Sequence, residues 1–371
     1  MAEWQEEFPQ QHDLLYLNHA AVAPWPRRTA LAVQAFAEQN CTLGARDYPA
    51  WLHVEQRLRR HLAMLIGGVP VSDIALLKNT SEGLSVIAQG LPWQAGDQVV
   101  ISDQEFPSNC IPWQALADQG VQVIEVNLDG AEPEQDVINA LGPRTRLVSL
   151  SAVQYGTGLK LDMAPIGAAC RQRGILFCVD AIQQLGALPF DALTDQADFV
   201  VADGHKWMLG PEGLALFYCR GEVQSQLTLR QHGWHMIANA GDYSQKDWQP
   251  ADDARRFECG SPNMLAAHAL EASLGLLLEL GMTQVAAALD ERMTRLITGL
   301  QARPGVQLLS DVRRHRRAGI VTFRVVGEDP QETCQRLKSG GVVCAQRGGG
   351  IRLSPHFYTA DSVIDRTLAL L

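Results

Sequence analysis

The stretch Ile175-Leu-Phe-Cys-Val-Asp-Ala-Ile-Gln-Gln184 joins a short apolar run to a carboxylate. An apolar run of this length, bounded by a glycine and a polar turn, is typical of a buried strand in a parallel sheet. Parallel sheets place ligand-binding groups at the edge where their strands end. Asp180 is therefore a candidate functional residue.

The alternation of short β-like runs and helical patterns extends outward from this stretch, from about residue 49 to residue 219. Such alternation predicts an α/β domain with a largely parallel sheet covered by helices. Strands are predicted over residues 74–77, 98–102, 121–126, 147–150, 175–179, 199–202 and 214–219. Helices are predicted over residues 81–89, 111–119, 133–141 and 164–173.

The pattern changes after Gly260. One long helical stretch, 264–301, is followed by predicted strands at 320–326 and 351–353 and by helices at 330–338 and 360–371. We therefore expect a large domain over residues 16–260. A smaller α/β domain should comprise residues 261–371 together with the N-terminal segment 1–15.

Composition narrows the classes of function. Of the 371 residues, 31 are lysine or arginine and 41 are acidic, and the net charge of −10 argues against a nucleic-acid or anionic-membrane binder. No apolar run reaches the roughly 20 residues of a bilayer span, and the acidic start lacks the order of a signal peptide. The eight cysteines are scattered without a CxxC pair. A cytoplasmic protein with reduced thiols and no metal site is expected.

A second functional candidate lies in Ala202-Asp-Gly-His-Lys-Trp-Met-Leu-Gly-Pro-Glu-Gly213. Lys206 follows an apolar strand closely, and the flanking glycines let a ligand approach the backbone. A strand-end lysine and a strand-end aspartate one βα step apart suit a pyridoxal phosphate site. The lysine forms the Schiff base, and Asp180 keeps the pyridine nitrogen protonated.

A third candidate lies in Lys78-Asn-Thr-Ser-Glu-Gly83, where a predicted strand ends and a helix begins. Free amides and the helix dipole form an anion site there, and the hydroxyls of Thr80 and Ser81 add donors. Taken alone, the segment also fits an ordinary helix cap. Together with Lys206 and Asp180 it favours a phosphate site.

These motifs resemble the class V aminotransferase group of fold-type I pyridoxal phosphate enzymes, which includes cysteine desulfurases, kynureninase and isopenicillin N epimerase-like proteins. The resemblance runs from Tyr16-Leu-Asn-His-Ala-Ala21 to Arg352-Leu-Ser-Pro-His-Phe-Tyr358. It implies the fold-type I architecture and a homodimer with shared active sites.

The resemblance also implies a role for each site residue. Lys206 would carry the cofactor, Asp180 would face the pyridine nitrogen, and Gln183 would bond the phenolic oxygen or the Schiff-base region. Arg352 would grip the substrate α-carboxylate, with Asn18 as a further substrate contact. The remaining residues implied at the cofactor are Thr80, Ser81 and His205 at the phosphate, Phe106 stacked on the ring, Gln154 near the cofactor oxygen, and Ser261 reaching the partner subunit's phosphate.

Three positions depart from the group's patterns. Asp203 stands where many members have serine, and its charge would repel a phosphate, so it either points away or orients a neighbour. Phe106 replaces the histidine of desulfurases and cannot move a proton. Cys344 is the nearest thiol upstream of Arg352, but its apolar, strand-like surroundings favour a buried structural cysteine.

The sequence thus predicts an enzyme acting on an amino acid or related amine, aminotransferase-like or epimerase-like. A cysteine desulfurase or lyase that releases sulfur from cysteine is the alternative. A protein without catalytic activity, such as a nucleotide-binding or cofactor-binding module, is a further alternative. Against nucleotide binding, the chain lacks a Walker A motif and a GxGxxG after the first strand.

Overall fold

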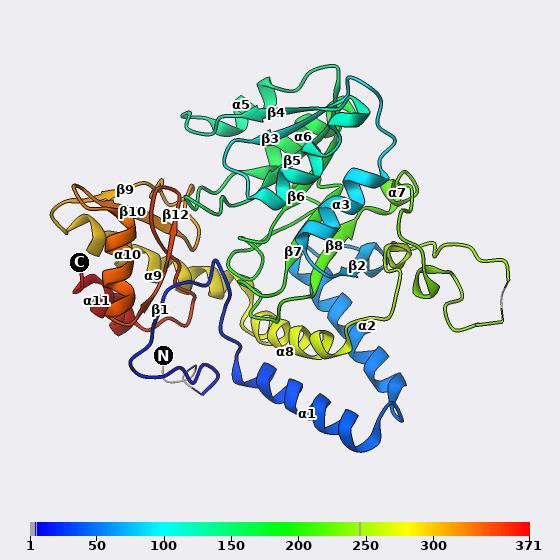
Figure 1. The fold of residues 1–371 in the computed structure, drawn as a ribbon, viewed down its shortest axis with the longest axis horizontal. Coiled ribbons are helices and arrows are strands. Elements are labelled where there is room, and N and C mark those ends of the chain that lie inside the picture. The colour runs from blue at the N-terminus through cyan, green and yellow to red at the C-terminus, as the bar shows by residue number, and fades with distance from the viewer. Residues whose placement is uncertain (1–3, 5, 245) are drawn as a thin grey trace.

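A seven-stranded sheet forms the centre of the computed structural model, which describes residues 4, 6–244 and 246–371 (Figure 1). Its strand order is β2-β8-β7-β6-β5-β3-β4. The five strands from β7 to β4 run parallel, whereas β8 runs antiparallel to both of its neighbours. The bounds are β2 Ile74–Leu77, β3 Gln98–Ser102, β4 Gln122–Val126, β5 Thr145–Ser151, β6 Leu176–Asp180, β7 Phe199–Asp203 and β8 Ala215–Cys219.

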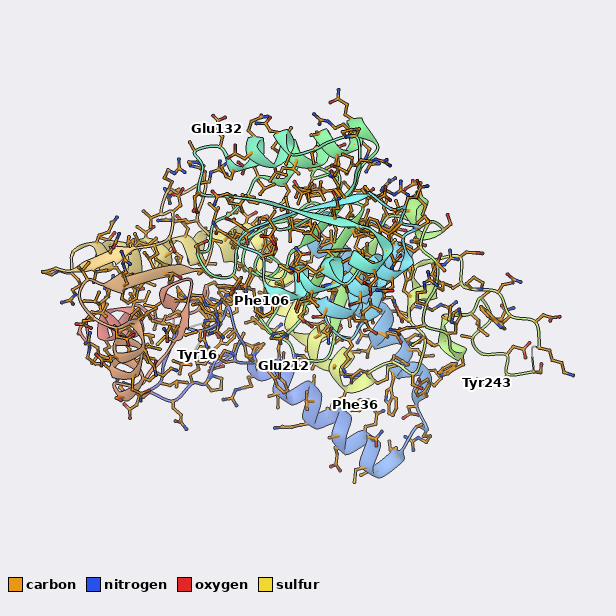
Figure 2. The ribbon with its side chains drawn as sticks, turned by 45° about the horizontal axis from the view of Figure 1, so that its top comes forward. Tyr16, Phe36, Phe106, Glu132, Glu212 and Tyr243 are labelled. Atoms are coloured by element: carbon orange, nitrogen blue, oxygen red, sulfur yellow. The ribbon has the colours of Figure 1, made fainter. Side chains whose placement is uncertain are left out.

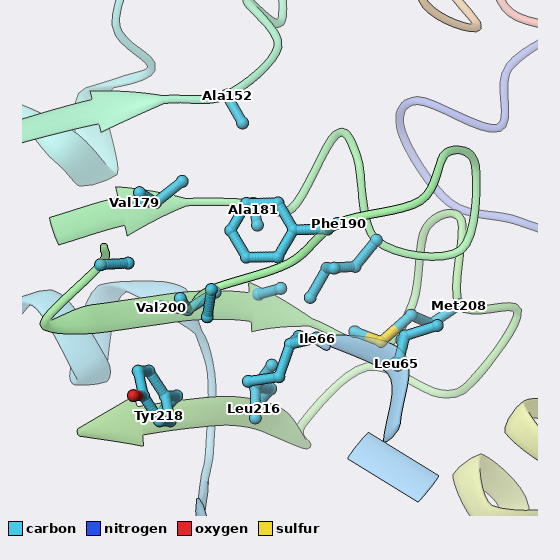
Figure 3. Close-up of a cluster of buried hydrophobic side chains, with 14 of the residues drawn as sticks. Leu65, Ile66, Ala152, Val179, Ala181, Phe190, Val200, Met208, Leu216 and Tyr218 are labelled. Carbon is cyan, nitrogen blue, oxygen red and sulfur yellow. The ribbon is translucent and has the colours of Figure 1, made fainter. Parts of the chain in front are cut away.

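Buried side chains pack on both faces of this sheet because successive strand residues point to opposite sides. Val179 and Val200 belong to the cluster on one face, shown in Figure 3, and Cys178 and Phe199 belong to the cluster on the other. The helices that follow the strands are α3 Thr80–Gly90, α4 Ile111–Gln114, α5 Pro133–Asn139, α6 Met163–Arg173 and the short α7 Gly221–Gln224. The predicted α/β fold is confirmed.

Two long helices precede the sheet, and the sequence patterns did not predict them as elements. They are α1 (Arg27–Leu43) and α2 (Tyr48–Leu65). Both pack against α8 (Met264–Leu280), beside the sheet domain (Figure 1). Leu62 of α2 and Leu270 of α8 lie in the same buried cluster as Val179.

The C-terminal domain has a four-stranded antiparallel sheet in the order β12-β13-β10-β9. The N-terminal strand β1 (Leu15–Tyr16) pairs in parallel with β11 and so joins the start of the chain to this domain. The remaining elements are α9 Met282–Gln301, β9 Val306–Leu308, β10 Val321–Val325, α10 Pro330–Ser339, β11 Val342–Val343, β12 Ala345–Arg347, β13 Gly350–Leu353 and α11 Asp361–Leu368.

The long helical stretch predicted over 264–301 is divided into two helices. Two helices, α8 and α9, meet at Gly281 with a bend of 84°. Gly281 has φ +82°, a conformation that glycine adopts without steric cost. Within the described residues no single helix is long and apolar enough to cross a membrane, although α8 and α9 together have the length and composition of a bent span.

Candidate active site

Asp180 and Lys206 lie at the ends of adjacent strands. Asp180 is the last residue of β6, 2% exposed, and its Oδ1 accepts a hydrogen bond of 3.0 Å from the amide of Ile182. Lys206 follows β7 by three residues. Burial raises the pKa of Asp180 and lowers that of Lys206, and the opposite charges of the two groups counteract both shifts. A buried carboxylate and a half-buried amine are thus held within each other's electrostatic field at this edge.

The loop that carries Lys206 is fixed through the next residue, Trp207. The indole Nε1 of Trp207 donates to Oε1 of Gln183 over 2.8 Å, and Nε2 of His356 lies 3.1 Å from the Trp207 carbonyl. Gln183 Nε2 donates to the carbonyl of Ala20 over 3.1 Å. The side-chain amide of Gln183 therefore binds protein groups through both its oxygen and its nitrogen. Among the described residues, one Nε2 hydrogen and one Oε1 lone pair remain for the cofactor contact that the resemblance implies.

The expected phosphate end is the N-terminus of α3. Oδ1 of Asn79 caps the helix by accepting from the amide of Glu82 over 2.8 Å. Thr80 is buried, whereas Ser81 is exposed and its hydroxyl is 2.8 Å from that of Ser108. His205 Nδ1 is buried and has no hydrogen-bond partner among the described residues.

Asp203 occupies this end rather than pointing away from it. Its Oδ2 accepts from the amide of Thr80 over 3.2 Å, and its own amide donates to the Thr80 hydroxyl over 3.1 Å. Of the two alternatives open from the sequence, the structure shows that Asp203 orients its neighbour. One amide donor of the α3 N-terminus is thereby bound to a carboxylate of the same chain.

The loop after β3 places Phe106 over the lysine. The ring centroid of Phe106 is 5.8 Å from Lys206 Nζ, and its edge meets Tyr155 at 5.1 Å between centroids. The ring is 41% exposed, and Figure 2 shows it near the middle of the molecule. The partly exposed ring beside Lys206 can therefore stack on a flat ligand.

Gln154 lies just after β5. Its Nε2 is 3.3 Å from both Oε1 of Glu105 and the carbonyl of Ser151, whereas its Oε1 is buried without a partner in the described chain. An orphaned buried carbonyl oxygen is unusual in a native fold. It is consistent with a contact to a donor of a bound molecule.

Arg352 comes from the C-terminal domain, on β13, and is 3% exposed. Nη1 donates to the carbonyl of Tyr155 over 2.8 Å, and Nη2 lies 3.5 Å from Oδ1 of Asn18. Its Nε has no hydrogen-bond partner, and none of the ion pairs of the described residues includes it. Burial lowers the pKa of Arg352 to about 10, so the guanidinium stays charged at neutral pH. A buried cation without an anion fits a carboxylate ligand.

Cys344 and Ser261 lie elsewhere. Cys344 is 4% exposed, its Sγ is 3.9 Å from Sγ of Cys334, and burial raises the pKa of its thiol. Ser261 is exposed on a surface pocket that Lys78 and Glu82 also line. Among the described residues, neither Cys344 nor Ser261 has a hydrogen bond or ion pair with Lys206.

Glu105 is a site residue that sequence reasoning missed. It is 7% exposed and accepts hydrogen bonds from the side chains of Ser102, Asn109 and Ser151 and from the Ser151 amide. Its charge adds to burial in raising the pKa of Asp180. The only local signal was its place next to Phe106, because burial of a carboxylate is not visible in sequence.

Two atoms expected at pyridoxal phosphate, His205 Nδ1 and Gln154 Oε1, are buried without a partner among the described residues. Arg352 Nε is likewise unpaired there, where the substrate carboxylate is expected. Lys206 and Asp180 are the amine and carboxylate that its aldehyde and ring nitrogen require. The residues present therefore fit this cofactor, although the charge of Asp203 is unfavourable at the expected phosphate end.

Comparison with known proteins agrees with this geometry. Residues 15–361 match the family "Aminotransferase class-V". A probable cysteine desulfurase of Methanothermobacter thermautotrophicus is 27% identical, over 97% of this chain and 94% of its own. The isopenicillin N epimerase of Streptomyces clavuligerus is 29% identical, over 99% and 97%.

Among solved structures, the cystine C-S lyase C-DES with its product cysteine persulfide is 27% identical, with a TM-score of 0.89 and 98% of both chains covered. A second C-DES structure, of a mutant with glycine covalently linked to the PLP cofactor, has a TM-score of 0.90 and 26% identity. With 347 consecutive residues matching the family (15 to 361 inclusive), this chain belongs to the class V aminotransferases, enzymes whose cofactor is pyridoxal phosphate.

Proposed function

We propose that this enzyme acts at the Cα atom of an α-amino acid, with amino transfer or epimerisation as its outcome. The observation that carries the proposal is Arg352, a buried guanidinium whose Nε is unpaired within the described chain. A substrate carboxylate supplies the missing anion and can bond two guanidinium nitrogens at once. Asn18, 3.5 Å from Nη2, orients the guanidinium from the other side.

Lys206 is the residue that moves the proton. Its lowered pKa makes the neutral amine available nearer to neutral pH than in a solvated lysine. Bound cofactor supplies an electron sink for the charge that develops when the Cα–H bond breaks. Asp180 would hold a proton on the cofactor's ring nitrogen, and Glu105, which accepts from the Ser151 amide, fixes the backbone beside it. Phe106 would stack on the cofactor's ring, but it has no group that transfers a proton.

A C–S lyase acting on cystine or cysteine is the second candidate. It is favoured by the similarity to C-DES, and it needs no persulfide-carrying thiol on the enzyme. A desulfurase with such a carrier is disfavoured, because Cys344 is buried and its thiol pKa is raised. Because one relative is a probable cysteine desulfurase, the test also measures the release of sulfur.

The test is incubation of the holoenzyme with single amino acids in D2O, followed by mass spectrometry and chiral analysis. We expect deuterium at Cα of the substrate, together with 2-oxo acid or the opposite enantiomer. Release of sulfur and pyruvate from cystine, without exchange into any sulfur-free amino acid, would instead establish the lyase. Absence of both reactions would contradict the proposal.

We also propose that the enzyme is a homodimer. Ser261 is exposed next to Lys78 and Glu82, residues that flank the start of α3. This surface position allows Ser261 to extend to a second copy. Size-exclusion chromatography with light scattering tests the proposal, and an active monomer would contradict it.

A further inference from the structure

The N-terminus of α3 already has an anion bound to it, the carboxylate of Asp203. Asp203 ends β7, is 8% exposed, and is tied to Thr80 by the reciprocal hydrogen bonds of 3.2 and 3.1 Å. A helix N-terminus stabilises a negative charge, and α3 has eleven residues. Asp203 therefore acts as an internal ligand of this helix.

The second carboxylate oxygen of Asp203 has no hydrogen-bond partner among the described residues. Oδ1 of Asp203 is buried and has no hydrogen bond within the described residues, and Nδ1 of His205 is likewise unpaired at 4.0 Å from it. The two unpaired atoms face each other across a gap too long for a hydrogen bond. Two buried polar atoms beside Lys206 thus have no partner among the described residues and can bind a polar group of a ligand.

We propose that Asp203 takes up a proton when the cofactor's phosphate binds, so that affinity for the phosphate group is linked to pH. This inference rests on the proposed cofactor site. Two anions at one helix end repel each other, and protonation removes the repulsion. A protonated Oδ1 gains a donor hydrogen for a phosphate oxygen, whereas the serine of relatives supplies a donor without any charge.

The groups that face Asp203 set its resting state. They are the Thr80 amide and hydroxyl from α3, Lys206 and His205 from its own loop, Asp180 from β6, and Glu212 from the turn before β8. Burial raises the pKa of Asp203 to about 6, partly offset by Thr80 and Lys206. Burial lowers the pKa of His205 to about 4, so the histidine is neutral and does not balance the aspartate near neutral pH.

Phosphate binding and protonation of Asp203 favour each other. A bound phosphate raises the pKa of Asp203 further, so the bound state holds more protons than the free state. Affinity is then highest below the pKa of the free protein and falls as the pH rises above about 6. If bound phosphate raises the pKa of Asp203 by one unit, the affinity for phosphate falls about tenfold as the pH rises from below the free pKa to above the bound pKa.

The experiment measures dissociation constants of pyridoxal phosphate and of pyridoxal for the cofactor-stripped protein between about pH 5 and pH 8. The ratio of the two constants isolates the phosphate contribution, because Lys206 and Asp180 act on both compounds. The variant is Asp203→Asn, which keeps an oxygen for the Thr80 amide and removes the titration. The matched control is Asp195→Asn, because burial also raises the pKa of Asp195 to about 6, in the loop at the other end of β7.

We expect the ratio to change with pH at least tenfold more in the wild type and in the Asp195 variant than in Asp203→Asn. Calorimetry of the wild type in two buffers of different ionisation enthalpy should show more proton uptake with pyridoxal phosphate than with pyridoxal. Equal pH dependence in all three proteins, or equal proton uptake for the two compounds, would overturn the inference alone. Failure of the wild type to bind either compound at any pH would overturn the cofactor site as well.

Discussion

Replacing Arg352 by glutamine removes the cation that the site offers to a substrate carboxylate. Arg352 is 3% exposed, and its Nε is unpaired in the described structure, so the carboxylate that binds there is desolvated. Truncating one partner of a buried charge pair costs about 2–5 kcal/mol. At about 1.4 kcal/mol per factor of ten, Arg352→Gln should weaken substrate binding by roughly 30-fold to several thousand-fold.

The assay is titration of the cofactor's visible band with an amino acid substrate and with the amine that lacks its carboxylate. Only the amino acid should lose affinity in the variant. Arg352→Lys should lie between wild type and glutamine, because a lysine keeps the charge but not the two-pronged geometry. Equal weakening for acid and amine, or no weakening for either, would refute the assignment of Arg352 to the carboxylate.

Three further changes test other parts of the site. Asp180→Asn should retain the cofactor but lower kcat by about two to three orders of magnitude, because the proton on the ring nitrogen loses its counter-charge. Near-normal turnover would argue against the role of Asp180 at the ring nitrogen. Cys344→Ala should leave turnover intact and reduce the free energy of unfolding by about 1 kcal/mol, because a packed thiol is lost. A persulfide trapped on Cys344 in the wild type but not in the variant would instead indicate a desulfurase. Ser261→Ala should weaken cofactor affinity by about 1–3 kcal/mol without loss of the dimer, and unchanged affinity would argue against a shared site.

The sheet could be predicted from sequence because its strands are apolar runs separated by clear stop signals. The predicted bounds of 74–77 and 98–102 coincide with β2 and β3. The break at Gly281 could not be predicted, because a single glycine inside a helical pattern is compatible with either a continuous or a broken helix. The helix α1 was not predicted because its apolar stripe is weak and its side chains are largely exposed.

Some site residues could be recognised from the local sequence, whereas others are placed by contacts between distant parts of the chain. Asp180 and Lys206 were recognisable because the carboxyl ends of neighbouring parallel strands meet at one edge. Arg352 and Asn18 reach this edge through contacts between distant parts of the chain, such as the β-bridge of Asn18 with Ser354 and the hydrogen bond from Arg352 to the Tyr155 carbonyl. The resemblance named both residues, but no spacing in the sequence could place them. The bond between Asp203 and Thr80 likewise joins residues 123 positions apart.

The central claim is that Lys206 carries the cofactor. Borohydride reduction of the holoenzyme fixes a lysine-linked cofactor covalently, and peptide mass spectrometry then locates it. We predict one reduced cofactor per chain, on the peptide that contains Lys206, and no label in Lys206→Ala. Label on another lysine, such as Lys78 near the start of α3, or full labelling of the Lys206→Ala protein, would contradict the account.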